Sequence, residues 1–497
     1  GDGLLDHAEE LFGTHGGGEH GNHAVIPTED GDALYVAAGN HTNLPDESII
    51  AGSRVPTWNE DLLLPREWDA NGHARGRLAP GGWITRFDPK TNRHEVISMG
   101  YRNQYDIALN RAGDLFTYDA DMEWDLGSPW YRPTRINHAV SGSDYGWRSG
   151  SGKWPEYYED SLPAVLNIGP GSPTGVVGGQ GAKFPAKYQD AIYALDWTFG
   201  TIYAIHLEPD GAGWKAHQEA FCYGAPLPVT DAIVGKDGAL YFTVGGRGTQ
   251  SALFRITYEG DDPTEPVSAP IPGEEARQQR RSLEAFHGKE HADAVAKAWP
   301  HLSSNDRWLR YAARIAVESQ PTEQWADKVF DESNTQARIT SAVALARRGN
   351  ESHRSDLVNA LLKMNPSELP EPQLLGLLRA YALTFIRLGE PTAEQRERVI
   401  EELDELLPNK SKDVNTELVR LLVYLESPTV IDKAIAMMTD AKPTVPAWVE
   451  NVNFQRNQRY GSRVLKMLEN QPPSHEINYA FMLRNLRDGW TMDNLRA

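Results

Sequence analysis

The sequence has little cysteine, a deficit of positive charge and no long apolar run. Among its 497 residues the one cysteine is Cys222, which excludes an intrachain disulfide, a cysteine-rich zinc site and a CxxCH haem attachment. The 49 Lys and Arg are outnumbered by 69 Asp and Glu, giving a formal net charge of −20, so a nucleic-acid partner is not expected. No run of about eighteen apolar residues occurs, so the sequence predicts no membrane span.

The start of the chain also lacks two common features. It begins at Gly1-Asp2-Gly3 without methionine, and no signal peptide is visible. We therefore expect a trimmed N-terminus. The sequence alone leaves the cellular compartment open.

Glycine is scarce in the second half of the chain. Of the 44 glycines, 37 precede residue 261 and seven follow it. The change falls at a Pro-rich stretch over 260–273, which is typical of a linker. We predict an all-β domain over 1–260, a linker over 261–275 and an α-helical domain over 276–497, each half long enough to bury its own core.

The first half contains short apolar or alternating runs between Gly, Pro and Asp turns, which predict strands. The clearest runs are 34–38, 83–87, 192–195, 202–207, 240–244 and 253–257. A strand–turn–strand phrase occurs three times, and its turn glycines, Gly31, Gly113 and Gly238, are 82 and 125 residues apart. These gaps are about two and three times a propeller blade of roughly 40–45 residues. Segments 40–82 and 119–181 look like long loops. The prediction is a β-propeller, six-bladed or an incomplete larger one.

After residue 275 the apolar spacing becomes helical. The segment 306–316 places Leu309, Ala312, Ala313 and Ala316 on one face. Further helix-sized units are 339–346, 374–388, 396–407, 418–425 and 430–438. Stacked helix pairs of this kind favour an all-α HEAT/armadillo-like solenoid, and the alternative is an irregular helical bundle.

A glycine-rich loop near the N-terminus carries two histidines. Glycines at 16, 17, 18 and 21 surround His20 and precede His23. Imidazoles on a loop at the end of a β scaffold can act as bases or as metal ligands. The alternative is a surface turn with solvated histidines.

Two arginine segments are candidate anion sites. Arg102-Asn103, entering a strand, could clamp a carboxylate or a quinone oxygen, and the alternative is a surface salt bridge. Arg247 lies among glycines at a strand end and could reach an anionic ligand, and the alternative is a simple turn. Carboxylates at alternate positions suit an oxygen-rich calcium site or a solvated acidic loop, and here they include Asp119, Asp121 and Glu123.

These segments resemble a known family. Residues 16–260 resemble the sorbosone dehydrogenase-like and soluble aldose (glucose) dehydrogenase propellers, which use the quinone PQQ with calcium. The resemblance lies in His20 standing ten residues before Asp30-Gly31, in Gly100-Tyr101-Arg102-Asn103 and in Tyr145-Gly146-Trp147. The whole chain is most similar to bacterial membrane-bound dehydrogenase-like proteins, through phrases such as GGGEHGNHA and TYDADMEWDLGSPWYRPTR. Those proteins combine a propeller with HEAT-type repeats and often a c-type cytochrome.

The resemblance implies an oxidoreductase that oxidises a sugar, polyol or sugar aldehyde with a quinone held at the propeller axis. His20 would be the general base, and Arg102, Asn103 and Arg247 would hold the PQQ cofactor. A calcium ion would lie near Asp119, Asp121 and Glu123. The resemblance further implies a periplasmic or secreted protein whose electron acceptor is a c-type cytochrome, since this chain has no haem motif of its own.

The chain departs from the family in three places. Gly21-Asn22-His23 replaces the Gly-Gly-Arg that follows the family's histidine, Gln104 replaces a proline, and 118–121 replaces a Glu-His-Gly-Pro segment that offers oxygens to calcium. Two alternatives therefore stay open. One is a metal-dependent, lactonase-like hydrolase that uses His20, His23 and the acidic loop, and the other is a non-catalytic binding scaffold.

Overall fold

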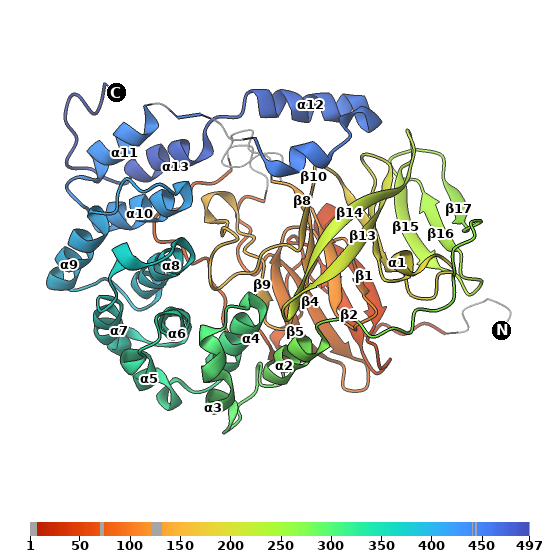
Figure 1. Cartoon of the computed structure of the whole chain (residues 1–497), viewed down its shortest axis with the longest axis horizontal. Coiled ribbons are helices and arrows are strands. Elements are labelled where there is room, and N and C mark those ends of the chain that lie inside the picture. Colours follow the sequence, from red (N-terminus) through yellow and green to blue (C-terminus); the bar gives the residue numbers. More distant parts are fainter. Residues whose placement is uncertain (1–6, 70–73, 121–131, 440, 443–444, 497) are drawn as a thin grey trace.

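The computed structural model describes residues 7–69, 74–120, 132–439, 441–442 and 445–496. Within these residues the N-terminal half is built from antiparallel sheets and the C-terminal half from helices, as predicted (Figure 1). Among the described residues of the sheet half, the one α-helix is the short α1 (Ala186–Gln189).

The strands of the described residues form four sheets. In each sheet the strand that comes first in the chain lies at one end of the strand order. Sheet 1 contains β1 (Asn22–Pro27), β2 (Leu34–Ala38), β4 (Gly82–Asp88) and β5 (Arg93–Tyr101), with β3 (Ile50–Ser53) and β9 (Ser143–Asp144) parallel to β5. Sheet 2 contains β6 (Asp106–Leu109), β7 (Leu115–Asp119), β8 (Thr134–His138) and β10 (Leu166–Gly169). Sheet 3 contains β11 (Pro173–Gly178), β12 (Ile192–Asp196), β13 (Thr201–Asp210) and β14 (Gly213–Tyr223). Sheet 4 contains β15 (Val229–Val234), β16 (Leu240–Val244) and β17 (Ala252–Ile256).

The four sheets are arranged like consecutive propeller blades. Their first strands, β1, β6, β11 and β15, contact one another in chain order. Because neighbouring strands run antiparallel, the segment before each first strand lies at the same edge as the connection between the second and third strands. We call this edge the entry edge. It gathers the histidine loop, the turn at 102–105, Ala120 and the loops that begin at residues 39, 197 and 245.

The described residues form four sheets, so of the two predicted forms the incomplete propeller remains and a complete six-bladed one is not seen in this part of the chain. The spacing of two and three blades inferred from the turn glycines is wrong. Gly31 and Gly113 lie in neighbouring sheets, and Gly113 and Gly238 lie two sheets apart. The first spacing is long because the connection from β2 to β4 carries a large excursion, whose described residues include a 3-10 turn (Glu47–Ile49) and the short β3. The segment 119–181 was also interpreted wrongly as a loop, because it contains β8, β10 and β11.

The helices of the second half stack in two rows. α2 (Glu274–Glu284), α4 (Arg307–Glu318), α6 (Thr335–Arg348), α8 (Glu371–Arg387), α10 (Lys412–Tyr424) and α13 (Ser474–Leu483) contact one another in that order. Packed against them are α3 (Ala294–Ala298), α5 (Ala326–Asp331), α7 (Arg354–Leu361), α9 (Ala393–Asp404) and α11 (Val430–Met438). Stacked pairs fit the predicted solenoid, and the assignment to HEAT-type repeats stays a prediction. None of the described helices has the length and apolar composition needed to cross a membrane.

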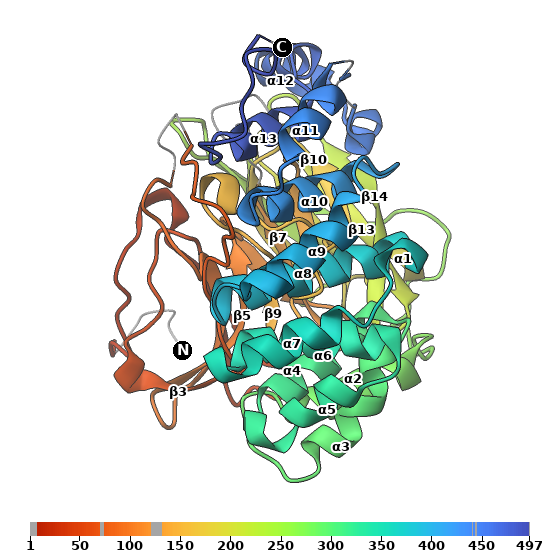
Figure 2. The same cartoon turned by 90° about the vertical axis from the view of Figure 1, so that its left-hand side faces the viewer.

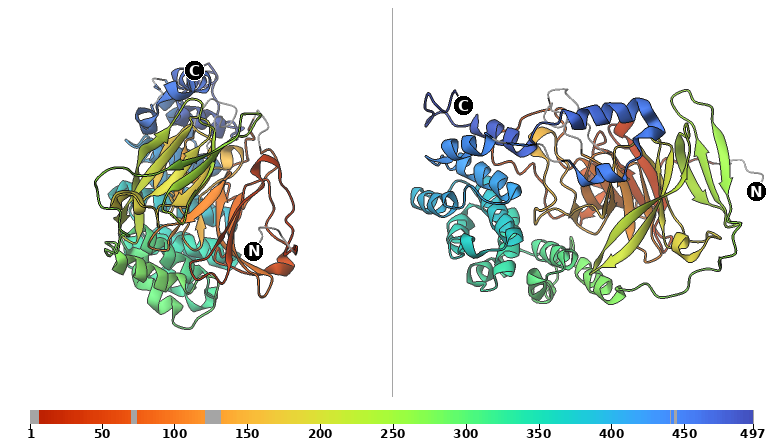
Figure 3. Two further views of the ribbon diagram at one scale, coloured as in Figure 1. Left: turned by 90° about the vertical axis from the view of Figure 1, so that its right-hand side faces the viewer. Right: turned by 45° about the horizontal axis from the view of Figure 1, so that its top comes forward.

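The helical rows curve around the sheets and share a core with them. Figures 1 and 2 show the helices as a crescent on the side of sheets 1 to 3, and Figure 3 shows sheet 4 on the far side of the molecule. The last helix before α13, α12 (Gln458–Glu469), crosses over the sheets. One continuous cluster of buried side chains includes Ile107 and Phe116 from the sheets and Leu309 from α4.

The predicted linker is fastened along the edge opposite the entry edge. Gln189 Nε2 donates to the carbonyls of Thr264 (3.3 Å) and Glu265 (2.9 Å), and Gln189 Oε1 accepts from the Val267 amide at 3.1 Å. Arg111 donates to the Ala269 carbonyl at 2.8 Å. The segment between β17 and α2 therefore runs bound beneath sheets 3 and 2 (Figure 1).

His287 joins the two halves and makes their packing sensitive to acid. It is buried, its Nε2–H donates to the Ala312 carbonyl of α4 at 2.9 Å, and its Nδ1 accepts from the Ser141 hydroxyl at 2.9 Å. Burial lowers the pKa of His287 to about 3. Between pH 3 and pH 6.5 the His287 imidazole is protonated in the unfolded chain and neutral in the folded chain. The free energy of unfolding therefore decreases as the pH falls below 6.5.

We expect the His287→Gln variant to have a flatter pH profile of stability than the parent chain. Each titrating histidine contributes a slope of up to about 1.4 kcal/mol per pH unit, so the parent should lose about 2 kcal/mol more than the variant between pH 7 and pH 5. Urea unfolding of both proteins at the two pH values measures this. Equal losses would show that His287 is not held neutral.

Candidate functional site

The histidine loop brings His20 against the loop that follows β2. His20 ends a single 3-10 turn (Gly18–His20) and is buried. Its Nδ1 lies 2.5 Å from Asn40 Oδ1, and its ring stacks on His41 with centroids 4.4 Å apart. With the amide in this orientation Nδ1 carries the proton and donates to Asn40, so Nε2 is the nitrogen that can accept one.

Asn103 joins the turn at 102–105 to the histidine loop at two points, the His23 side chain and the carbonyl of Glu19, the residue before His20. Its Oδ1 accepts from His23 Nε2 at 2.7 Å, and its Nδ2 donates to the Glu19 carbonyl at 3.3 Å. The His23 ring stacks on Tyr105. Burial lowers the pKa of His23 and the bond to Asn103 acts against it, so His23 is a neutral brace for Asn103.

Arg102 lies beside His41 and borders a cavity. Its carbonyl accepts from the Asn40 amide at 2.9 Å, and its side chain lines a cavity of about 200 Å³. Burial lowers the pKa of His41, and the positive charges of Arg77 and Arg102 lower it further. The turn is held in place by Gln104, which donates to the carbonyls of Ala38 and Trp83, each at 2.9 Å.

Arg247 reaches the same loop from sheet 4. It has a positive φ of 49° and its guanidinium lies 3.4 Å from Glu19 Oε1, with both side chains largely exposed. It also lies over the Trp197 ring at 5.4 Å, and Trp197 Nε1 donates to the Gly245 carbonyl at 2.8 Å. Glu19 is thus contacted by Asn103 through its carbonyl and by Arg247 through its carboxylate.

The structure brings four of the predicted residues, His20, Arg102, Asn103 and Arg247, together at the entry edge. Sequence reasoning missed three neighbours that complete the arrangement: Asn40, His41 and Trp197. It also missed Asp196, which ends β12 beside Trp197 and whose burial raises its pKa to about 7. The available signal was topological, because Asn40, His41 and Trp197 follow the second strand of a sheet and Asp196 ends one.

Of the three residues predicted to lie near calcium, the structure describes Asp119. Asp121 and Glu123 lie outside the described residues. Asp119 is buried, and its Oδ1 accepts from the amides of Arg102 (3.1 Å) and Asn103 (2.8 Å), while its Oδ2 pairs with Arg135 at 3.3 Å. Asp119 therefore caps the 102–103 turn. In the described part of the chain no three His, Cys, Asp or Glu side chains gather as a metal site, and calcium stays a prediction.

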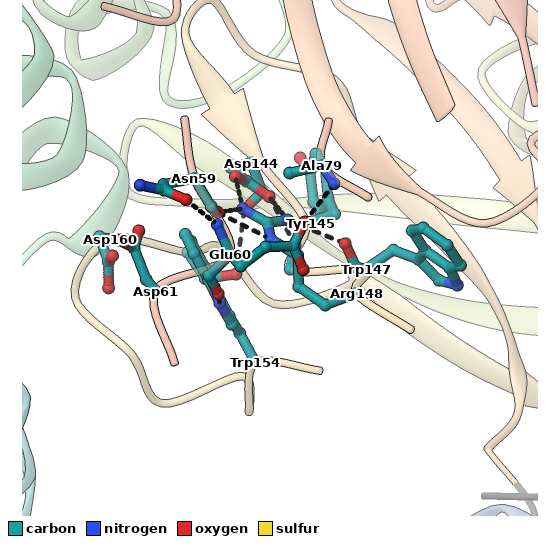
Figure 4. Close-up of polar contacts among 12 residues, drawn as sticks. Asn59, Glu60, Asp61, Ala79, Asp144, Tyr145, Trp147, Arg148, Trp154 and Asp160 are labelled. Atoms are coloured by element: carbon teal, nitrogen blue, oxygen red, sulfur yellow. Dashed lines mark hydrogen bonds and ion pairs between the residues drawn. The ribbon is translucent and has the colours of Figure 1, made fainter. Parts of the chain in front are cut away.

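The Tyr145-Gly146-Trp147 phrase leads into a buried arginine. Arg148 donates to Asp144 Oδ2 at 2.9 Å and to the Asn59 carbonyl, and its guanidinium lies 4.1 Å from the centre of the Trp154 ring (Figure 4). The Trp147 ring points away from this cluster (Figure 4). Arg148 therefore anchors the long β2–β4 excursion to β9 of sheet 1, and Trp147 faces elsewhere.

Gly39 is the point of closest approach within the site. A Cβ at this position would overlap Asn103 Oδ1 and would lie 2.9 Å from the His20 carbonyl oxygen. We expect Gly39→Ala to displace Asn103 and to lower the free energy of unfolding by about 1–3 kcal/mol, as overpacking does. Urea unfolding measures the loss. The matched control is Gly52→Ala, where no atom lies within 4 Å of the added Cβ, and an equal change in both variants would contradict this packing.

No family model and no curated protein matches the chain. Among solved structures, it is similar to a glucose dehydrogenase-type oxidoreductase of Thermus thermophilus at 20% identity and a TM-score of 0.33, over 48% of this chain and 66% of that one. The PQQ-bound aldose sugar dehydrogenase of Streptomyces coelicolor is 16% identical with a TM-score of 0.30, over 47% and 61%. The apo-form soluble aldose sugar dehydrogenase of Escherichia coli is 14% identical with a TM-score of 0.31, over 44% and 59%. The matches span less than two thirds of each of these chains, and a likeness this low identifies neither a fold nor an activity.

Proposed function

We propose that the chain is an oxidoreductase that oxidises a sugar, polyol or sugar aldehyde with a quinone cofactor of the PQQ type at the entry edge. The observation that carries the proposal is the meeting of His20, Arg102, Asn103 and Arg247 around Glu19 and His41. These residues come from three different sheet connections. A packed core alone does not require two arginines and two imidazoles at one point.

His20 would take the proton of the substrate hydroxyl. With Nδ1–H donated to Asn40, Nε2 accepts the proton while Asn40 fixes the tautomer and the orientation of the ring. When bound, the quinone accepts the two electrons and the hydrogen that leave the carbinol carbon. The products are a carbonyl compound and the reduced cofactor.

The residues at this edge suit a flat polycarboxylate. Arg102 and Arg247 supply charges for carboxylates, and the Trp197 ring supplies a flat face next to Arg247. Gly39 lets Asn103 and His20 approach this edge closely, because any side chain at this position would displace them. No step of the proposal uses calcium, because Asp119 already holds the 102–103 turn.

Reconstitution tests the proposal directly. The protein incubated with PQQ and Ca²⁺ should reduce an artificial electron-acceptor dye with at least one member of a panel of aldoses, polyols and sugar aldehydes. No dye reduction with any member of the panel would contradict it. The c-type cytochrome acceptor, the periplasmic or secreted location and the HEAT-type repeats rest on the sequence resemblance and are part of the same proposal.

A further inference from the structure

A cavity of about 320 Å³ lies at the entry edge where sheets 3 and 4 meet the helical half. Its walls are the β12–β13 connection (197–200), the β14–β15 connection (224–228), Thr249 and the pair Arg456-Asn457, which directly precedes α12 where that helix crosses the sheets (Figure 1). The volume is that of a small-molecule site. We propose that this cavity binds a small organic anion, in which a carboxylate or phosphate group is joined to an apolar ring. The inference needs neither the quinone nor any redox step.

Arg456 is the one charged residue among the described residues that line this cavity. Its guanidinium lies 4.0 Å from the centre of the Tyr223 ring, and its Nη1 donates to the Thr201 hydroxyl at 2.9 Å. Within the described part of the chain that bond is its one hydrogen bond, and no carboxylate lies within ion-pair distance. Nε is enclosed by the protein, so Nη2 is the nitrogen left to bind a ligand. An arginine fixed in this way loses little further conformational entropy when it binds an anion.

Asp196, which lies outside the cavity wall, offsets the charge of Arg456 only in part. Its Oδ1 accepts from the amides of Ser172 and Thr198, each at 2.9 Å. Burial raises the pKa of Asp196 to about 7, against the bonds to backbone amides and the charge of Arg456, which lower it. Near pH 7 about half of this carboxyl group is therefore protonated. The cavity keeps a positive charge in a chain of net charge −20, and a concave apolar site strengthens its effect on an approaching anion.

The rest of the lining fits an apolar ring. Trp197 and residues 226–228, Pro-Leu-Pro, supply aromatic and aliphatic surface, against which a ring can pack. Thr249 and Asn457 already donate to backbone carbonyls at 2.6 and 2.8 Å, so Arg456 is the anchor for the acid group. A neutral ring compound lacks the charged group that an arginine binds most strongly.

Isothermal titration of the full chain at pH 7, without cofactor, tests the proposal. The probes are benzoate and phenyl phosphate, with benzyl alcohol as a neutral reference of similar size. We expect at least one anion to bind at 1:1 stoichiometry, to bind more weakly as salt is added, and to bind at least tenfold more tightly than benzyl alcohol. Benzoate and phenyl phosphate distinguish a carboxylate site from a phosphate site. Absence of binding by both anions, or equal binding of benzyl alcohol, would overturn the proposal.

Two variants locate the binding. Arg456→Gln removes the charge, and Asn457→Asp places a negative charge in the wall while keeping a residue that caps α12, so each should weaken anion binding at least tenfold. Arg463→Gln, at an exposed position on α12, is the matched control and should bind like the parent. Unchanged binding in Arg456→Gln, or in Asn457→Asp if Arg456→Gln does not fold, would overturn the proposal. Because no dye or quinone is present, this result is independent of the reconstitution assay.

Discussion

Replacing His20 by asparagine is expected to lower the turnover of the reconstituted enzyme by about 10²–10⁴-fold, the usual contribution of a general base. The variant removes the acceptor nitrogen but leaves a side chain of similar polarity beside Asn40 and His41. The steady-state rate of dye reduction at saturating sugar measures the effect. We expect binding of the quinone to change far less than turnover.

The control for this experiment is His217→Asn. His217 lies on β14, and its side chain is 63% exposed, so turnover should stay at the parent level. If His20→Asn retained the parent rate, His20 would not be the base. His41→Asn would then be the informative variant, because that ring stacks directly on His20.

Replacing Asp160 by asparagine is expected to lower the free energy of unfolding by about 3–5 kcal/mol, as breaking a buried ion pair does. Asp160 lies in the 150–165 segment of the sheet half and is fully buried. It accepts from Arg379 Nε at 2.9 Å and Nη2 at 2.8 Å, both on α8, and from Arg347 Nη1 of α6 at 3.2 Å. Burial raises the pKa of Asp160, but these two arginines outweigh it and hold the pKa well below its ordinary value.

At the interface between the halves the variant would remove the carboxylate that pairs with buried Arg379 and one of the three carboxylates around buried Arg347, which keeps Glu318 and Asp61. Urea unfolding at pH 7 measures the loss, and Asp160→Glu, which keeps the charge, should lose less. The control is Asp237→Asn, since Asp237 pairs with Arg255 at an exposed hairpin and its removal should leave stability nearly unchanged. Equal stability of Asp160→Asn and the parent would contradict the account of this interface.

Local chemistry in the sequence was enough to predict much of the fold. The Asp and Gly turns after β1, β6 and β15 identified their hairpins, and helical spacing identified α4, α6 and α8. The sequence does not predict strands β10 and β11, because Leu166–Gly169 and Pro173–Gly178 are short and contain Gly or Pro. These strands are held by pairing with their neighbours in the sheet and not by the β-propensity of their own residues. The Asp160 cluster was beyond prediction, because Asp160 and Arg379 are 219 residues apart.

The candidate site was predictable where a residue stood in a distinctive segment. His20, Arg102, Asn103 and Arg247 each lie beside glycines or in a polar pair next to a strand. Asn40 and His41 also follow a glycine, Gly39, at a strand end, but their part in the site is visible only when the antiparallel pairing of β1 with β2 brings them to His20. Trp147 stood in a phrase that the sequence singles out, but the packing of its ring on Gly81 is visible only in the folded structure.

The most direct test of the central claim is a titration of the chain with PQQ. The account predicts one binding site per chain, weakened at least tenfold in Arg102→Gln and in Arg247→Gln, since a bond between charged groups contributes about that much. Arg255→Gln, at an exposed position on β17, should bind like the parent. Absence of binding, or binding that neither Arg102→Gln nor Arg247→Gln weakens, would contradict a shared quinone site at the entry edge.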